Sequence, residues 1–270
     1  MIIKQEEVFV VDDQFVKFLI TEPRRNKNKI GIFDINYVTK RNPWTAAFWA
    51  MALPGLGHIH LGLYIKGFIL ISGEIFLNLT GHINEAILYT MTFQFDKVHQ
   101  VTNLNWAFLY CSIWVLAIFD SYRVAVELNK YTWFEEKQSV RYFKKGVLEI
   151  LGINFIEKRT PWMSIFLSAT LSGLSHICNN KLISGLTLLG WMIAIAYYTE
   201  YPNMIIYTFT GQFERINSIV NYKWLLFFPS IYFFAIFDAY THTVNYNNLY
   251  KEEQKYYLLN KFGKNDFDLV

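Results

Sequence analysis

Charged residues are scarce in this sequence: Asp, Glu, Lys and Arg make up 17% of its 270 residues, against roughly 25% in soluble domains. Only two cysteines are present, so no disulfide framework is implied. The net charge of +3 and the lack of a dense basic tract argue against a nucleic-acid partner. Apolar residues, by contrast, reach 53% and aromatic residues 19%. This composition indicates an integral membrane protein whose first partner is the lipid bilayer.

Long stretches of the chain carry almost no charge. The charge-poor runs are 42–65, 98–119, 160–180, 182–199 and 224–250, the last of which holds the single charge Asp238. About 20 apolar residues in a helix are needed to cross a hydrocarbon core about 30 Å thick. The sequence therefore predicts an all-α integral membrane protein.

The same motifs return 118 positions further along the chain. The repeated strings are KRNPW at 40–44 and KRTPW at 158–162, GLGHI at 55–59 and GLSHI at 173–177, and AIFDSY at 117–122 and AIFDAY at 235–240. One offset is kept without a gap from position 35 to position 122. This regularity predicts a tandem duplication.

Lysine and arginine are distributed unevenly between the segments. Residues 1–42 hold eight, residues 123–159 hold eight and the tail holds four, whereas the loops at 81–104 and 199–223 hold three in all. The positive-inside rule then places both termini and the linker in the cytoplasm. The expected segments are a cytoplasmic N-terminal segment (1–35), membrane repeat 1 (36–130), a basic cytoplasmic linker (131–153), membrane repeat 2 (154–248) and a cytoplasmic tail (249–270). Residues 7–20 predict a small β-hairpin, and the linker is expected to be helical in part.

Each repeat has three apolar pieces but must cross the membrane an even number of times. The first piece, 44–53, has only ten residues, or about 15 Å of helix, before Pro54 and Gly55 interrupt it. We predict a short re-entrant or half-inserted helix that turns back at 55–57, followed by two transmembrane helices. The alternative is that the first piece crosses fully. An even number of crossings makes the repeats parallel, with a pseudo-two-fold axis along the membrane normal.

Asp120 and Asp238 occupy matching positions late in the third apolar segment of each repeat. An acid at membrane depth is costly, so it should face the protein interior and have a partner. The candidate partners of Asp120 are His58, the backbone donors at 55–57 and Arg123. Two interpretations stay open: a structural clamp for the broken hairpin, or a proton or ion relay.

Two histidines, His58 and His176, follow the glycines at matching positions, and His60 and Cys178 stand two residues further on. These four side chains are metal candidates because His-x-His steps bind zinc or copper, although a closed zinc site usually needs four ligands. The alternative is a histidine hydrogen-bonded to the backbone in a tight turn. No cofactor is expected.

The string LPGLGHIHLGLYIKG at 53–67, followed by WVLAIFD at 114–120, resembles the two-transmembrane domain family. The likeness is greater to bacterial multipass proteins with a Pro-Gly-x-Gly-His, Lys-Gly, Trp and Asp pattern. In that family a glycine-rich turn precedes the first crossing; the matching residues here are Pro54, Gly55 and Gly57, with Gly173 in the second copy. The resemblance implies a small integral membrane protein and brings no assured reaction.

Three function classes follow from these observations. The leading one is a non-enzymatic scaffold, accessory or regulatory protein with membrane-protein partners. The second is a small transporter or ion-conducting protein in which Asp120 and Asp238 line a shared path. The third is an intramembrane metal-dependent enzyme that uses His58, His60 and Asp120.

Overall fold

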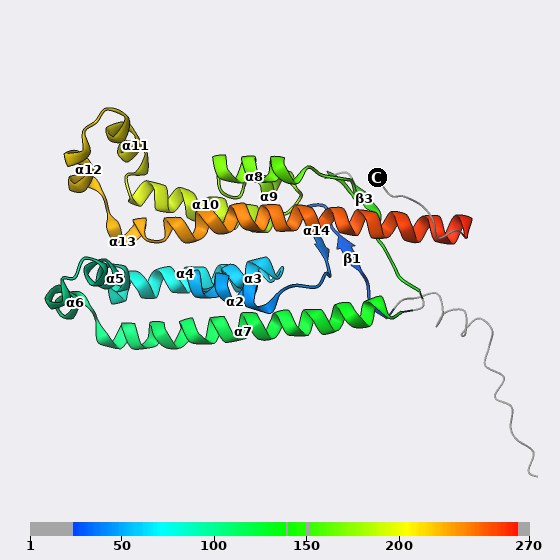
Figure 1. The fold of residues 1–270 in the computed structure, drawn as a ribbon, viewed down its shortest axis with the longest axis horizontal. Coiled ribbons are helices and arrows are strands. Elements are labelled where there is room, and N and C mark those ends of the chain that lie inside the picture. Colours follow the sequence, from blue (N-terminus) through cyan, green and yellow to red (C-terminus); the bar gives the residue numbers. More distant parts are fainter. Residues whose placement is uncertain (1–23, 139, 150–151, 264–270) are drawn as a thin grey trace, which may run out of the picture.

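Helices make up most of the protein, and the longest of them run along its longest axis, in a computed structural model that describes residues 24–138, 140–149 and 152–263 (Figure 1). The hairpin predicted at 7–20 lies outside these residues. Two halves lie side by side, and the long helices α7 and α14 run in the same direction (Figure 1). The strands gather toward one end of the molecule and the short helices α5, α6, α11 and α12 lie at the other. The prediction of a mostly helical protein is confirmed.

The first half begins with the antiparallel strands β1 (Asn28–Ile30) and β2 (Ile35–Tyr37). Its helices are α2 (Pro43–Ala52), α3 (Leu56–His60), α4 (Tyr64–Gly81), α5 (Ile83–Met91), α6 (Phe95–Val101) and α7 (Leu104–Glu136). The second half begins with the antiparallel strands β3 (Gly146–Glu149) and β4 (Gly152–Phe155). Its helices are α8 (Pro161–Thr170), α9 (Leu174–Cys178), α10 (Leu182–Tyr198), α11 (Tyr201–Phe209), α12 (Phe213–Ile219), α13 (Tyr222–Leu225) and α14 (Phe228–Phe262). Helices α8 to α13 each begin 118 positions after α2 to α7.

Local sequence explains how the first helix of the first half begins and ends. The Asn42 side chain accepts a hydrogen bond of 2.9 Å from the backbone N–H of Trp44, and Pro43 occupies the first turn, where its missing donor costs nothing. The helix stops before Gly55, which has φ of +104°, in the left-handed region that favours glycine. A Cβ on Gly55 would also collide with the carbonyl of Gly67 in α4. Gly55 therefore permits both the turn and the close contact between α3 and α4.

The glycine turn is kept in the second half despite two sequence changes. Gly173 has φ of +90° and approaches the Gly185 carbonyl as Gly55 approaches Gly67. Asn180 replaces Gly62, and it also adopts a positive φ, of 55°. Asparagine tolerates the left-handed region better than other residues with a side chain, so the bend between α9 and α10 survives.

The segments predicted as polar loops contain short helices instead. Helices α5 and α6 fill most of 81–104, and α11 to α13 fill most of 199–223. The sequence INEAILYTM at 83–91 lacks glycine and proline and carries an apolar face, which permits a helix. Polarity alone did not distinguish such short surface helices from loops.

The linker at 131–153 also differs in detail from its expectation. Helix α7 continues to Glu136, because no glycine or proline interrupts the residues that follow position 130. The rest of the linker holds strand β3, which pairs with β4 in a second hairpin. Helix α14 likewise continues beyond 248 and stops only at Gly263, whose φ is +64°.

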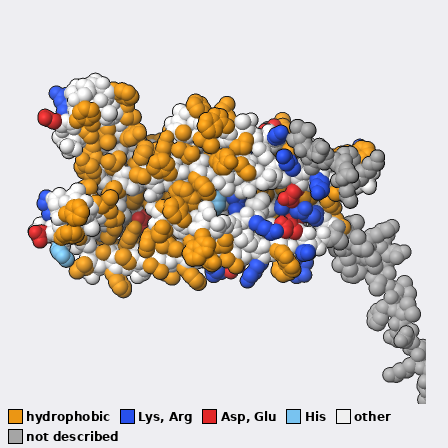
Figure 2. Space-filling view, viewed as in Figure 1, with side chains coloured by type: hydrophobic (Ala, Val, Ile, Leu, Met, Phe, Trp, Pro, Cys, Tyr) orange, Lys and Arg blue, Asp and Glu red, His pale blue; other side chains and the backbone are white. Residues whose placement is uncertain are grey.

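Among the described residues, two helices are long and apolar enough to cross a membrane: α7, and the continuous α13–α14 unit at Tyr222–Phe262. A third span arises if α10 and α11, which are bent by 61° relative to each other, count as one. Only 17% of the most apolar window of α7 is buried within the protein. Hydrophobic side chains cover the middle of the face drawn in Figure 2, and charged side chains gather near β3 and the C-terminal part of α14.

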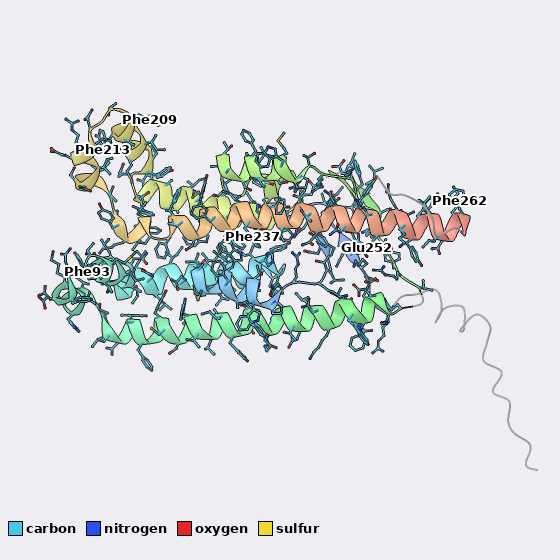
Figure 3. All side chains as sticks on the ribbon, viewed as in Figure 1. Phe93, Phe209, Phe213, Phe237, Glu252 and Phe262 are labelled. Carbon is cyan, nitrogen blue, oxygen red and sulfur yellow. The ribbon has the colours of Figure 1, made fainter. Side chains whose placement is uncertain are left out.

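The core lies where the two halves meet. Trp49 of α2 packs edge-on against Phe234 of α14, and Phe237, labelled in Figure 3, contacts both Trp49 and His60. Toward the strand end, Glu135 of α7 is fully buried and pairs with Arg141 at 2.8 Å. The same arginine reaches Glu252 of α14 at 3.0 Å. An apolar contact and an ion-pair network therefore both join the halves.

Candidate functional site

A carboxylate surrounded by histidines lies at the contact between the two halves. Asp238 is fully buried in α14. His60, from α3 of the first half, donates from Nδ1 to its Oδ1 at 2.6 Å. His176, from α9 of the second half, donates from Nε2 to its Oδ2 at 3.0 Å, and His242, one turn further along α14, places Nε2 3.2 Å from the same oxygen. We call these four residues the Asp238 cluster.

The hydrogen bonds fix the proton positions in the Asp238 cluster. An ionised carboxylate only accepts hydrogen bonds, so each of the three facing ring nitrogens carries a proton. Lys181, which precedes α10 and is 5% exposed, places Nζ 2.9 Å from Nδ1 of His242. Because an ammonium only donates, this nitrogen is the unprotonated one. One buried carboxylate and one buried ammonium thus share a neutral histidine.

Two tyrosines complete the polar network. Tyr37, at the end of β2, donates its hydroxyl to the backbone carbonyl of His242 at 2.9 Å. Burial raises the pKa of Tyr37 to about 12, so the phenol stays protonated at neutral pH. Tyr64 at the start of α4 accepts from Lys181 at 3.2 Å and donates to the side chain of Asn36. The network therefore reaches from the helices to the first hairpin.

Asp120 has different surroundings. His58 donates from Nε2 to its Oδ2 at 2.8 Å, which matches the bond between His176 and Asp238. The remaining partners of Asp120 are cations: Lys66 contacts Oδ2, and Arg123 contacts Oδ1 at 2.7 Å. Asp120 is also 22% exposed. It closes its own half and has no contact with the Asp238 cluster.

The metal hypothesis takes a different form in the structure. Ligand atoms of His60, Asp238 and His242 lie within 4.8 Å of one another, a set of two histidines and one carboxylate that can hold a divalent metal ion. Lys181 stands against this use, because its Nζ is only 3.3 Å from Nε2 of His242 and would repel a cation there. Without a metal ion, the Lys181 ammonium already balances the charge of the Asp238 carboxylate, and the histidines supply its hydrogen bonds.

The predicted residues divide between two sites. His58 lies on Asp120, whereas His60 crosses to Asp238, so the set of His58, His60 and Asp120 does not meet at one point. Cys178 is exposed, away from the cluster. Of the predicted turn residues, Pro54 and Gly55 lie between α2 and α3, Gly173 lies between α8 and α9, and Gly57 lies in the first turn of α3.

Sequence reasoning missed His242, Lys181 and Tyr37. The spacing of Asp238 and His242, four apart on one helix, was a usable signal, since such residues share a face. Lys181 was visible as the single charge between two apolar runs. Tyr37 gave no comparable signal, because only the tertiary fold brings a strand residue to a helix 205 positions away.

Comparisons with known proteins add no further assignment. The chain matches no protein-family model, no curated protein and no solved structure. Function is therefore inferred from the geometry of this chain.

Proposed function

We propose that the chain is a multipass integral membrane protein of scaffold, accessory or regulatory type, built from two parallel tandem repeats. The observation that carries this proposal is that Asp238 of one half is hydrogen-bonded to His60 of the other half. This hydrogen bond holds the two halves in a fixed orientation relative to each other. A scaffold that binds partner proteins requires such a fixed surface. Catalysis or transport needs no such permanent bond between the halves.

Support for the membrane comes from apolar side chains that the protein itself does not cover. Exposed residues of this kind on α7 include Phe108, 78% exposed, and Phe119, 64% exposed. Large exposed apolar surfaces in soluble proteins are rare, whereas lipid satisfies them. Phe93 and Phe209, 82% and 87% exposed, lie at the tips of the short-helix end (Figure 3). We infer that these tips lie in the outer interface.

The topology follows from the same reasoning. Helices α2 and α8 have ten residues each, too short to cross, and act as half-inserted helices in the proposed arrangement. In this arrangement α4 with α7, and α10 with α14, provide the crossings, although α4 is shorter than α7 and the α13–α14 unit and is not among the helices long and apolar enough to span by themselves. Both termini are then cytoplasmic. Cysteine accessibility tests this: single cysteines near both ends should be labelled only after the membrane is opened, and one at Phe209 should be labelled in intact cells. Labelling of the two ends from opposite sides contradicts the proposal.

The scaffold role is tested by comparing abundance with partner capture. Asp238→Asn should lower the amount of folded protein and the yield of any membrane partner co-purified in mild detergent, both by the same factor. Asp96→Asn, in the exposed helix α6, is the matched control and should change neither. Normal abundance with lost ion flux in Asp238→Asn would instead favour transport.

One observation supports that second candidate, an ion or proton relay. Asp238, His242 and Lys181 form a continuous hydrogen-bonded path, and the last two residues line a cavity of about 390 Å³ near the strand end. Reconstitution in vesicles with a pH-sensitive dye separates the two candidates, because a scaffold gives no proton flux above that of empty vesicles.

A further inference from the structure

A basic cavity lies between the first hairpin, the start of α4 and the two long helices. It has a volume of about 390 Å³. Its polar wall includes Lys29, Arg41, Lys181 and the amides of Asn28 and Asn36. No aspartate or glutamate is among the described residues that line it. The cavity therefore has many hydrogen-bond donors and an excess of positive charge.

Arg41 is the least satisfied cation of this wall. Its Nη1 is buried and has no hydrogen-bond acceptor among the described residues. The Tyr37 ring lies 5.9 Å from its guanidinium and the two side chains interact, but no described carboxylate lies within ion-pair distance of Arg41. A buried guanidinium nitrogen without an acceptor costs free energy, which an incoming anion would recover.

The equivalent arginine of the second half shows what Arg41 lacks. Arg159, 118 positions on, donates to the backbone oxygen of Asn179 at 2.5 Å, covers the ring of Tyr246 at 4.3 Å and lies 3.9 Å from Glu157. The first half replaces the two side-chain partners, Tyr246 and Glu157, with Leu128 and Thr39, whereas Leu61, the equivalent of Asn179, still offers a backbone oxygen. Leu61 and Leu128 both line the cavity. The change from an aromatic ring to Leu128 thus removes a partner of the arginine and also shapes the space beside Arg41.

We propose that this cavity binds a phosphate-bearing anion, with Arg41, Lys29 and Lys181 facing the phosphate. Arginine presents a planar fork of donors that matches phosphate oxygens, and the asparagine amides add neutral donors. Leu63 and Tyr131, each about a third exposed, line the same cavity and offer apolar surface to the rest of the ligand.

Two sources supply this chemistry. One is the headgroup of an anionic phospholipid, since basic pockets at the cytoplasmic ends of membrane helices bind such headgroups. The other is a soluble organic phosphate such as glycerol 3-phosphate. Only the lipid source depends on the proposed membrane location, so its failure leaves the soluble source, and the topology experiment above is judged separately.

The experiment uses the full chain purified in detergent. Native mass spectrometry counts retained phosphatidylglycerol against phosphatidylcholine, and calorimetry measures the binding of glycerol 3-phosphate. Arg41→Gln should weaken binding about tenfold or more, as expected for one charged hydrogen-bonding partner. Arg159→Gln, the same change at the partnered arginine, should leave binding within about twofold.

A second variant removes the site without changing the charge. Leu128→Tyr gives Arg41 the aromatic ring that Arg159 has and fills part of the cavity. We expect binding to be lost as in Arg41→Gln while the thermal midpoint is unchanged or raised. Retention of phosphatidylglycerol alone identifies the lipid source, and binding of glycerol 3-phosphate alone identifies the soluble one. No binding of either probe, or equal binding by wild type and both variants, overturns the proposal.

Discussion

Asp120 and Asp238 occupy equivalent positions 118 residues apart, yet one lies in a partly exposed ion-pair site and the other in a buried histidine cluster. Each accepts a hydrogen bond from the histidine after the glycine turn, at 2.8 Å and 3.0 Å. That bond is the common element, and it closes the bend of each half. The other polar partners of the two acids differ.

The divergence has a simple physical logic. Asp120 is 22% exposed and is neutralised by Lys66 and Arg123, whose heads are nearly half exposed. Asp238 is fully buried and is surrounded mainly by imidazoles, with the ammonium of Lys181 behind His242. Exposed ion pairs contribute little to stability, whereas a buried, fully hydrogen-bonded carboxylate is costly to disturb. Of the two acids, Asp238 is therefore expected to contribute more to the stability of the contact between the halves.

The largest expected effect is that of neutralising this carboxylate. Asp238→Asn removes the charge that three histidines face, and we expect a loss of about 3–5 kcal/mol in the free energy of unfolding. Asp120→Asn should cost about 1 kcal/mol or less. Thermal unfolding in detergent, followed by tryptophan fluorescence, measures both. Equal shifts for the two variants would contradict the distinction between the sites.

The second largest loss of stability is expected when His242 is replaced by the residue at the equivalent position of the first half. Position 124, its equivalent, is valine. His242→Val leaves the Lys181 ammonium and one Asp238 oxygen with fewer partners, at a cost of about 2–3 kcal/mol. The control is His99→Val in the exposed helix α6, for which the midpoint should not move. If His242→Val leaves the thermal midpoint unchanged, Lys181 must find another hydrogen-bond acceptor.

The repeated strings predicted where the apolar segments, the glycine turns and the two acids lie, because hydropathy and backbone conformation are local properties. They did not predict that Asp238 would take His60 from the other half. At that position the second copy has Cys178, so a search for matching residues gave no symmetric partner. A contact that only one half makes cannot be found by comparing the sequences of the two halves.

The hairpins of β1 with β2 and β3 with β4 show a second limit. Each strand has only three or four residues, too few for alternation to stand out from the surrounding loop. Their stability depends on packing: Ile30 and Ile35 are buried against Tyr246 of α14. Strands of this kind are set by tertiary contacts more than by local sequence.

A smaller effect is expected when Tyr37 is exchanged for the phenylalanine found at its equivalent, position 155. Tyr37→Phe removes the hydrogen bond to the His242 carbonyl and should cost about 1 kcal/mol. Tyr240→Phe, at an exposed tyrosine, is the control.

The pH dependence sharpens this prediction. Burial raises the pKa of Tyr37 to about 12 from an ordinary value of 10.0. The protonated phenol therefore contributes fully below about pH 10, and its contribution is lost as the pH rises toward 12. The difference between wild type and Tyr37→Phe should stay constant from about pH 6 to 9. A difference that changes within that range would show that Tyr37 ionises more readily than its burial implies.

The smallest expected effect lies at the exposed acid. Arg123 pairs with Asp120 and Glu127, and its equivalent in the second half is Thr241. Because the arginine side chain is 48% exposed, Arg123→Thr should lower the thermal midpoint only slightly, and added salt should reduce the difference further. The thermal midpoint measured at low and high ionic strength checks both statements. A large loss that salt does not change would mean that Asp120, like Asp238, is a buried link, and the contrast between the two halves would fail.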